Sequence, residues 1–158
     1  MLHTEIEIKA SAQQVWAILS DFQAYPAWNP FIKSVVGKPE QGEKLHIEVQ
    51  PGDGKSMRFS PKVLIAEPER ELRWLGQLGV RGLFDGEHYF IIKAVSESLV
   101  HFQHGERFSG LFVGMLRSSL ERDTKRGFEE MNQALQARAE ARYAARHDAK
   151  QSDIKREQ

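Results

Sequence analysis

The hydrophobic pattern of the chain changes its period once, near residue 110, and this change strongly limits the possible folds. Apolar and polar side chains alternate from about Leu83 to Ala94 and from Leu99 to Phe108, as in strands buried on one face. Beyond residue 110 the apolar side chains recur at helical spacing. The pattern therefore predicts a sheet whose apolar face is covered by one long helix.

Five earlier segments complete the predicted sheet. They are short apolar or alternating runs over residues 2–9, 32–36, 44–50, 57–65 and 71–75. Turn signals such as Pro51-Gly52-Asp53-Gly54 separate neighbours, so an antiparallel meander is predicted. Pro61 lacks an N–H donor and indicates a bulge or an edge position. Inward-facing rows are predicted for Thr4, Ile6 and Ile8 and for Met57, Phe59, Pro61, Val63 and Ile65.

Two short helical segments are predicted after the first strand. Ser11-Ala12-Gln13-Gln14 matches a capping box, in which Ser11 caps the Gln14 amide, and the helix ends near Asp21. The stretch from Tyr25 to Phe31 contains two prolines and predicts a turn or a single helical turn.

The terminal helix is predicted from about Leu111 to Ala145, a length of roughly 50 Å at ~1.5 Å per residue. Because this exceeds what a small sheet can cover, its last turns are expected to protrude. We expect one domain over residues 1–145 and a polar, disordered tail over 146–158. The apolar stripe of the helix comprises Leu116, Leu120, Phe128, Met131 and Leu135, with Thr124 bridging it.

Composition excludes several classes of function. Lys and Arg together number 22, as do Asp and Glu, and this balance argues against nucleic-acid binding, which needs a basic excess. The chain has no cysteine, so disulfides and thiol catalysis are excluded. No apolar run approaches the ~20 residues of a membrane span, and the start of the chain lacks the apolar stretch of a signal peptide. A cytoplasmic protein without stable membrane insertion is expected.

The last two predicted strands place ionisable groups opposite each other. If Ser96-Glu97-Ser98 forms the connecting loop, Val95 lies opposite Leu99. The same register places Phe90 opposite His104 and His88 opposite Glu106, with Cβ atoms ~4.5–5.5 Å apart. We therefore predict an inward-facing His88–Glu106 pair, with His104 one diagonal step away.

This pair lies among aromatic side chains, which indicates an apolar container with a few polar groups. His88 and Glu106 are candidate acid–base catalysts, although a pair that orients a ligand is the more common arrangement. His104 and Glu106 with His88 could also ligate zinc or iron, but nothing else supports a metal, and neither metal nor cofactor is predicted. The candidate ligand-binding residues are Trp28, Phe59, Trp74, Phe84, Phe90, Phe102, His104, Phe108 and Met131. For Trp28 and its neighbour Asn29 the alternative is structural, as an anchor of the small helices and a turn cap.

The combined motifs resemble the START-like (SRPBCC) superfamily over about residues 2–140. The resemblance implies an α+β helix-grip fold, in which a seven-stranded antiparallel sheet wraps round a long C-terminal helix and two short helices follow the first strand. It also implies an apolar cavity between sheet and helix. The motifs are Val15-Trp16-x-x-Leu19-x-Asp21, Tyr25-Pro26-x-Trp28-Asn29-Pro30-Phe31, Arg70-Glu71-Leu72-x-Trp74, Gly86-Glu87-His88-x-Phe90, His104-x-Glu106-x-Phe108-x-Gly110 and Phe128-x-x-Met131-Asn132-x-x-Leu135.

Within the superfamily the chain is most similar to bacterial polyketide cyclase/dehydrase-like members. The first hypothesis is binding of a small hydrophobic or amphipathic ligand, which is lipid-, polyketide- or aromatic-like. The alternative is a cyclase, dehydratase or hydrolase that uses His88 and Glu106 as an acid–base pair. A second alternative is a protein-interaction module of the chaperone-activator type, as in another branch of the superfamily.

Overall fold

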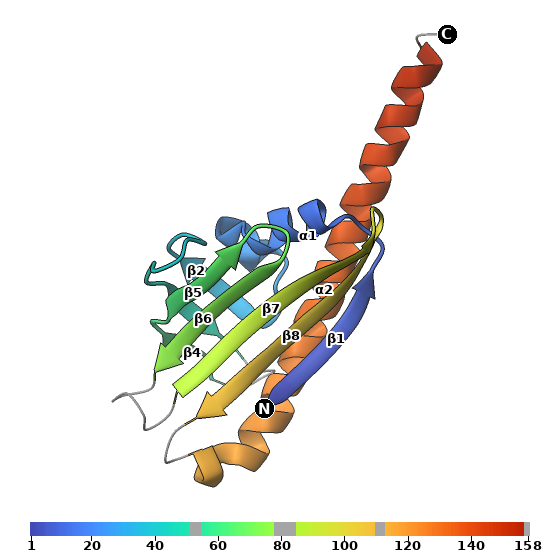
Figure 1. Ribbon diagram of the computed structural model, residues 1–158. Helices are drawn as coiled ribbons and strands as arrows, with labels where there is room; N and C mark the ends of the chain where they lie inside the picture. The colour runs from blue at the N-terminus through green and yellow to red at the C-terminus, as the bar shows by residue number, and fades with distance from the viewer. Residues whose placement is uncertain (51–54, 78–84, 110–112, 157–158) are drawn as a thin grey trace.

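The computed structural model describes residues 1–50, 55–77, 85–109 and 113–156, and in the last helix the side chains from Arg122 to Ala149 (Figure 1). Strands and short helices come first and one long helix comes last. The elements are β1 (Leu2–Ile8), α1 (Ala12–Leu19), η1 (Phe22–Ala27), β2 (Ile32–Val36), β3 (His46–Val49), β4 (Met57–Phe59), β5 (Lys62–Glu67), β6 (Glu71–Gln77), β7 (Asp85–Ser96), β8 (Leu99–Ser109) and α2 (Val113–Arg156).

The strands form two sheets that are joined at a proline. One has the order β1-β8-β7-β6-β5 and the other β2-β3-β4, and all pairs are antiparallel. The Leu45 amide donates to the Pro61 carbonyl at 2.8 Å, and Lys44 pairs with Lys62. β4 and β5 are therefore two parts of one strand that breaks at Pro61. Counted in this way, the described residues contain the predicted seven antiparallel strands, divided between these two joined sheets.

A bulge in β5 corrects one predicted inward row. Val63 pairs with Trp74, but Ile65 pairs with Arg73, so Leu64 is the extra residue. Trp74 belongs to the buried face of the sheet, and Arg73 lies on the other face. The prediction that Ile65 faces inward is wrong, because the bulge shifts the side-chain alternation by one residue.

The predicted short helices are confirmed, and each has an identifiable local cause. The Ser11 hydroxyl accepts the Gln14 amide at 3.3 Å and caps α1. The buried Tyr25 hydroxyl of the 3₁₀ helix η1 donates to the Leu19 carbonyl at 2.6 Å, which ties the two helices together. The Asn29 side-chain oxygen then accepts the amides of Phe31 and Ile32, so Asn29 caps the turn into β2.

The helix α2 runs along the face of the sheet beside β1 and β8, and its C-terminal part extends beyond the β7–β8 hairpin (Figure 1). Two of its side chains close the edge of β1, because Gln136 donates to the Glu7 carbonyl and Glu140 accepts the Lys9 amide. Its buried stripe is Thr124, Phe128, Met131, Leu135 and Ala139. The predicted stripe residues Leu116 and Leu120 lie outside the described side chains.

The end of α2 differs from the expected tail. The helix continues to Arg156, so residues 146–156 are helical where the sequence predicted disorder. The domain boundary at residue 145 stays a prediction. No helix in the described ranges is long and apolar enough to cross a membrane.

Gly127→Ala is expected to lower the free energy of unfolding by about 1–3 kcal/mol. A Cβ at position 127 would overlap the buried ring of Phe31, which also packs edge-to-face on Phe128. This cost exceeds the gain of about 1 kcal/mol that Ala offers over Gly in a helix. Urea denaturation measures the change, with the exposed Gln133→Ala on the same helix as control. A more stable Gly127→Ala protein would contradict this close contact.

Candidate functional site

The predicted pair of ionisable residues lies on the inner face of β7 and β8. His88 is directly opposite Glu106, and the His88 Nδ1 and Glu106 Oε2 atoms are 3.8 Å apart. The β7–β8 connection is tighter than predicted, because Ser96 pairs with Leu99 and Val95 is bulged. The bulge takes up the missing loop residue, so the register predicted for His88 and Glu106 is confirmed.

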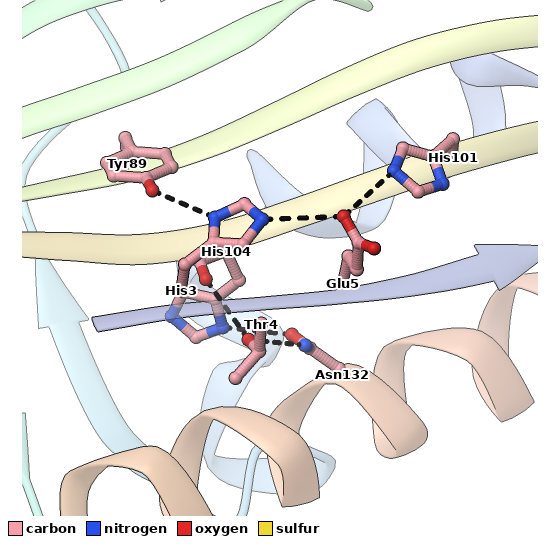
Figure 2. A network of polar contacts seen from close by, with 7 residues as sticks. All are labelled: His3, Thr4, Glu5, Tyr89, His101, His104 and Asn132. Atoms are coloured by element: carbon pink, nitrogen blue, oxygen red, sulfur yellow. Dashed lines mark hydrogen bonds and ion pairs between the residues drawn. The ribbon is translucent and has the colours of Figure 1, made fainter. Parts of the chain in front are cut away.

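A chain of polar contacts extends from this pair into the interior. His88 Nε2 meets His104 Nε2 at 3.0 Å, and His104 Nδ1 meets the Asn132 side-chain oxygen at 2.9 Å. The Asn132 amide donates to the Thr4 hydroxyl at 2.9 Å, and that hydroxyl donates to the His104 carbonyl at 3.1 Å (Figure 2). We call the five residues Glu106, His88, His104, Asn132 and Thr4 the polar relay. It joins β7, β8, α2 and β1.

Aromatic rings enclose both imidazoles of the relay. His88 stacks on Trp74, with ring centroids 5.0 Å apart and planes at 5°, and meets Phe90 and Phe128 edge-on. His104 stacks on Phe128 with centroids 3.9 Å apart. The two imidazoles are thus separated from water, and the polar relay provides their hydrogen-bond partners.

Burial lowers the pKa of His104 well below its usual range, and the neighbouring His88 lowers it further. The hydrogen bond to Asn132 acts in the opposite direction but is the smaller effect. His104 is therefore a neutral imidazole at neutral pH. Glu106 is the relay group with the most contact with water, because 20% of its side chain is exposed against 7% for His88.

Two glycines lie near Glu106 on the inner face of the sheet. Gly76 and Gly86 form a directly opposed pair of β6 and β7, two residues along from Trp74 and His88. The Glu106 carboxylate lies where a Cβ on Gly86 would be, whereas a Cβ on Gly76 would meet no atom closer than 3.8 Å. Glycine allows a ligand to approach the backbone closely. We call these two residues the glycine pair.

The structure brings together most of the residues predicted to form a site. Phe90 and Phe102 stack on each other beside the imidazoles, and Met131 is fully buried on α2. Phe59 and Phe108 are half-buried and pack against the core. Trp28 packs edge-to-face on Tyr25, with centroids 5.2 Å apart, as the structural alternative predicted. Phe84 lies outside the described residues.

Sequence reasoning did not assign Thr4 and Asn132 to the site. Thr4 was placed on the inward face of its strand, and a polar residue in an apolar row is the signal that it needs a buried partner. Asn132 follows the buried Met131 and lies one turn after Phe128, so its spacing also places it on the inner side of α2.

A second polar network covers the outer face of the sheet and does not reach the relay. Tyr89 bonds to His3 at 3.0 Å, and the Glu5 carboxylate lies between His3 at 3.4 Å and His101 at 3.2 Å. Figure 2 shows Tyr89, Glu5 and His101 on the side of β1 that faces away from α2. Hydrogen bonding by His3 lowers the pKa of Glu5. Within the described ranges, no group of three or more His, Asp or Glu side chains is arranged to hold a metal ion.

Comparison with known protein families shows which family has this architecture. Residues 2–140 match the family described as polyketide cyclase / dehydrase and lipid transport. The chain belongs to this family. The match covers every strand and the part of α2 that packs on the sheet. Comparison with curated proteins gives no match.

Solved structures similar to this polyketide cyclase / dehydrase family member confirm the helix-grip fold. A START superfamily protein from Mycobacterium smegmatis is 25% identical, with a TM-score of 0.65 over 89% of this chain and 97% of that one. The Zhui aromatase/cyclase from Streptomyces sp. R1128 is 17% identical, with a TM-score of 0.71 over 89% and 93%. Norcoclaurine synthase from Thalictrum flavum, in complex with dopamine and hydroxybenzaldehyde, is 16% identical, with a TM-score of 0.63 over 86% and 83%.

The glycine pair offers a matched test of the Glu106 position. Gly86→Ala is expected to push the carboxylate away from His88, at a stability cost below about 1 kcal/mol because the carboxylate can rotate. Gly76→Ala places its methyl group at ordinary contact distance from the Gly86 carbonyl and from Pro61, so it should leave the carboxylate in place. The imidazole resonances of His88 in NMR spectra report the difference. Equal shifts of these resonances in both variants would contradict the described position of Glu106.

Proposed function

We propose that the protein binds a small hydrophobic or amphipathic molecule between the sheet and α2, with the polar part of the molecule at Glu106. The observation that carries this proposal is the position of Glu106. Its carboxylate is the partly exposed end of a buried polar relay, and it lies beside a glycine pair that contributes no side chains of its own.

The surrounding side chains suit such a ligand. Trp74 and His88 form a stacked, rigid wall one step from the glycine pair, and the half-buried Phe108 faces Gly86 across the strands. Apolar contact with such walls contributes affinity at ~25 cal/mol per Å² buried. A few fixed polar groups then decide the orientation of the ligand, and Glu106 with His88 supplies them.

The comparisons support this proposal. The family description covers polyketide cyclases, dehydrases and lipid transport, all of which handle largely apolar molecules. Norcoclaurine synthase holds two small aromatic compounds in a similar fold. For this chain the candidate ligand is therefore a compact lipid-, polyketide- or aromatic-like molecule.

Filling the space above the glycine pair tests the proposal. Native mass spectrometry of the gently purified protein should show a bound small molecule, and titration with 2-naphthol should show saturable binding. We expect Gly76→Leu to weaken naphthol binding at least tenfold without unfolding the protein, because its side chain would occupy the place that we propose for the ligand. Lys93→Leu, at an exposed position of β7, is the control. Unchanged affinity in Gly76→Leu would overturn this location of the ligand.

The His88–Glu106 contact favours a second candidate, an enzyme of the cyclase, dehydratase or hydrolase kind. A carboxylate next to an imidazole can accept and return a proton of a bound ligand. Deuterium exchange next to the carbonyl of 2-tetralone in D₂O would reveal proton abstraction. Glu106→Gln should abolish the exchange and retain binding, whereas exchange that persists in this variant would exclude Glu106 as the base. The protein-interaction alternative stays a prediction.

A further inference from the structure

The inner end of the polar relay determines which nitrogen of His104 carries a hydrogen. The Thr4 hydroxyl donates its one hydrogen to the His104 carbonyl at 3.1 Å, and a carbonyl can only accept. The same hydroxyl must therefore accept from the Asn132 amide nitrogen, which lies 2.9 Å away. This orientation turns the Asn132 oxygen toward His104 Nδ1, so Nδ1 carries a hydrogen.

A second acceptor on α2 supports this assignment. The backbone carbonyl of Phe128 is also a hydrogen-bond partner of the His104 ring. Because the Asn132 oxygen and this carbonyl can both only accept, the imidazole must donate toward α2. Fully buried His104 is neutral and has one ring hydrogen, so its Nε2 atom is left with a lone pair.

The same reasoning extends to His88. The Nε2 atoms of His104 and His88 are 3.0 Å apart, which is hydrogen-bond distance. Because the His104 atom offers only a lone pair, His88 must donate, and its hydrogen lies on Nε2. A neutral His88 then has no hydrogen on Nδ1. The Thr4 hydroxyl thus sets the tautomer of His88 through Asn132 and His104.

We propose that the relay holds His88 as the Nε2–H tautomer, so that His88 Nδ1 accepts a hydrogen bond from a hydroxyl or amine of the bound ligand. Thr4 and Asn132 are positioning residues, because they act on the ligand only through the two imidazoles. The inference rests on the proposed function for the place of the ligand, and it adds the kind of polar group that the ligand presents there.

The surroundings of His88 Nδ1 suit a ligand that donates. Glu106 Oε2 lies 3.8 Å away, which is too long for a hydrogen bond, so this contact leaves Nδ1 able to bond a third group. A carboxylate is itself an acceptor. The two groups together therefore favour a phenol, an alcohol or an amine over a ketone or an ether of the same shape.

The aromatic rings around His88 fix the direction of its Nδ1 atom. Trp74 stacks on the imidazole with planes at 5°, and Phe90 and Phe128 meet it edge-on. A half-turn of the imidazole would also place a carbon atom where Nε2 now bonds to His104. The acceptor is thus oriented before a ligand arrives, which lowers the cost of ordering the site on binding.

Long-range ¹H–¹⁵N correlation spectra of the ligand-free protein test the inference, because they assign each imidazole hydrogen to its nitrogen. At pH 8, above the titration range of an ordinary imidazole, His88 should carry its hydrogen on Nε2 and His104 on Nδ1. In Thr4→Val the Asn132 amide loses its fixed partner and can rotate to donate to His104. Both imidazoles should then change tautomer together, with at least a severalfold increase of the Nδ1–H form of His88. Thr4→Ser restores the hydroxyl and should return the wild-type spectrum.

Two matched probes test the contact with the ligand. 2-Naphthol and 2-methoxynaphthalene share the same fused rings, but only naphthol has a hydrogen to donate. Saturation with naphthol should move the ¹⁵N resonance of His88 Nδ1 upfield, as expected for a lone pair that accepts a hydrogen bond. The ether should leave this resonance at its ligand-free position.

Three results would overturn the inference: a wild-type His88 with its hydrogen on Nδ1, a Thr4→Val spectrum identical to wild type, or a naphthol complex in which the Nδ1 resonance does not move. If Thr4→Val does not fold, the wild-type spectrum still decides. The ligand-free spectra need no probe, so an Nε2–H tautomer of His88 without naphthol binding would contradict only the proposed function. Naphthol binding to a protein with the opposite tautomer would contradict only this inference.

Discussion

Replacing Phe128 with alanine is expected to lower the free energy of unfolding by about 3–5 kcal/mol, the largest effect of any substitution considered. The Phe128 ring of α2 is fully buried and meets three other rings from separate parts of the chain. It stacks on His104 at 3.9 Å, meets His88 edge-on at 5.1 Å and packs edge-to-face on Phe31 at 5.4 Å. Its loss creates a cavity and also opens the relay to water, so the polar groups lose their defined partners.

Urea denaturation followed by circular dichroism measures this loss. Phe59→Ala is the matched control, because it removes the same ring from a half-buried position of the three-stranded sheet and should cost about 1–2 kcal/mol. In the ligand-free Phe128→Ala protein, the imidazole resonances of His88 and His104 should no longer be separate. Equal costs for the two variants would show that α2 does not close over the imidazoles as described.

The register of the central hairpin could be predicted because the side-chain period of a strand is two. Once His88 and Phe90 were assigned to the inner face, the same face of β8 had to contain His104 and Glu106. The details of the connection did not matter, because the bulge at Val95 restored the register that a longer loop would have produced. The two-residue alternation and the assignment of His88 and Phe90 to the inner face were sufficient to predict these positions. The family resemblance supplied the order of the elements.

The features that sequence reasoning missed depend on single residues. No periodic signal marks the bulge at Leu64, which removes Ile65 from the inner row. Thr4 and Asn132 are 128 positions apart, and each is one polar residue in an apolar row, so nothing in the sequence pairs them. The length of α2 was underestimated because its end buries little apolar surface, and the periodic signal comes from burial.

The stability of the folded protein is expected to fall steeply as the pH decreases from about 6.5 to 5, and His104 is the cause. Burial lowers the pKa of His104 in the folded state, whereas in the unfolded chain it has its usual value of about 6.5. Below that pH, His104 binds a proton in the unfolded chain but stays neutral in the folded protein. The stabilisation is therefore complete above the unfolded pKa and is lost as the pH falls, at up to about 1.4 kcal/mol per pH unit for this one group.

Urea denaturation of two variants at pH 7.0, 6.0 and 5.0 tests whether His104 causes this pH dependence of stability. His104→Gln removes the titrating group but keeps an amide that can donate to Asn132, and it should flatten the slope by most of that amount. Phe90→Leu keeps every imidazole and lowers stability through packing, so it should shift the curve without changing its slope. A wild-type slope that survives in His104→Gln would mean that His104 already accepts a proton in the folded state. That result would contradict a neutral His104 at the inner end of the relay.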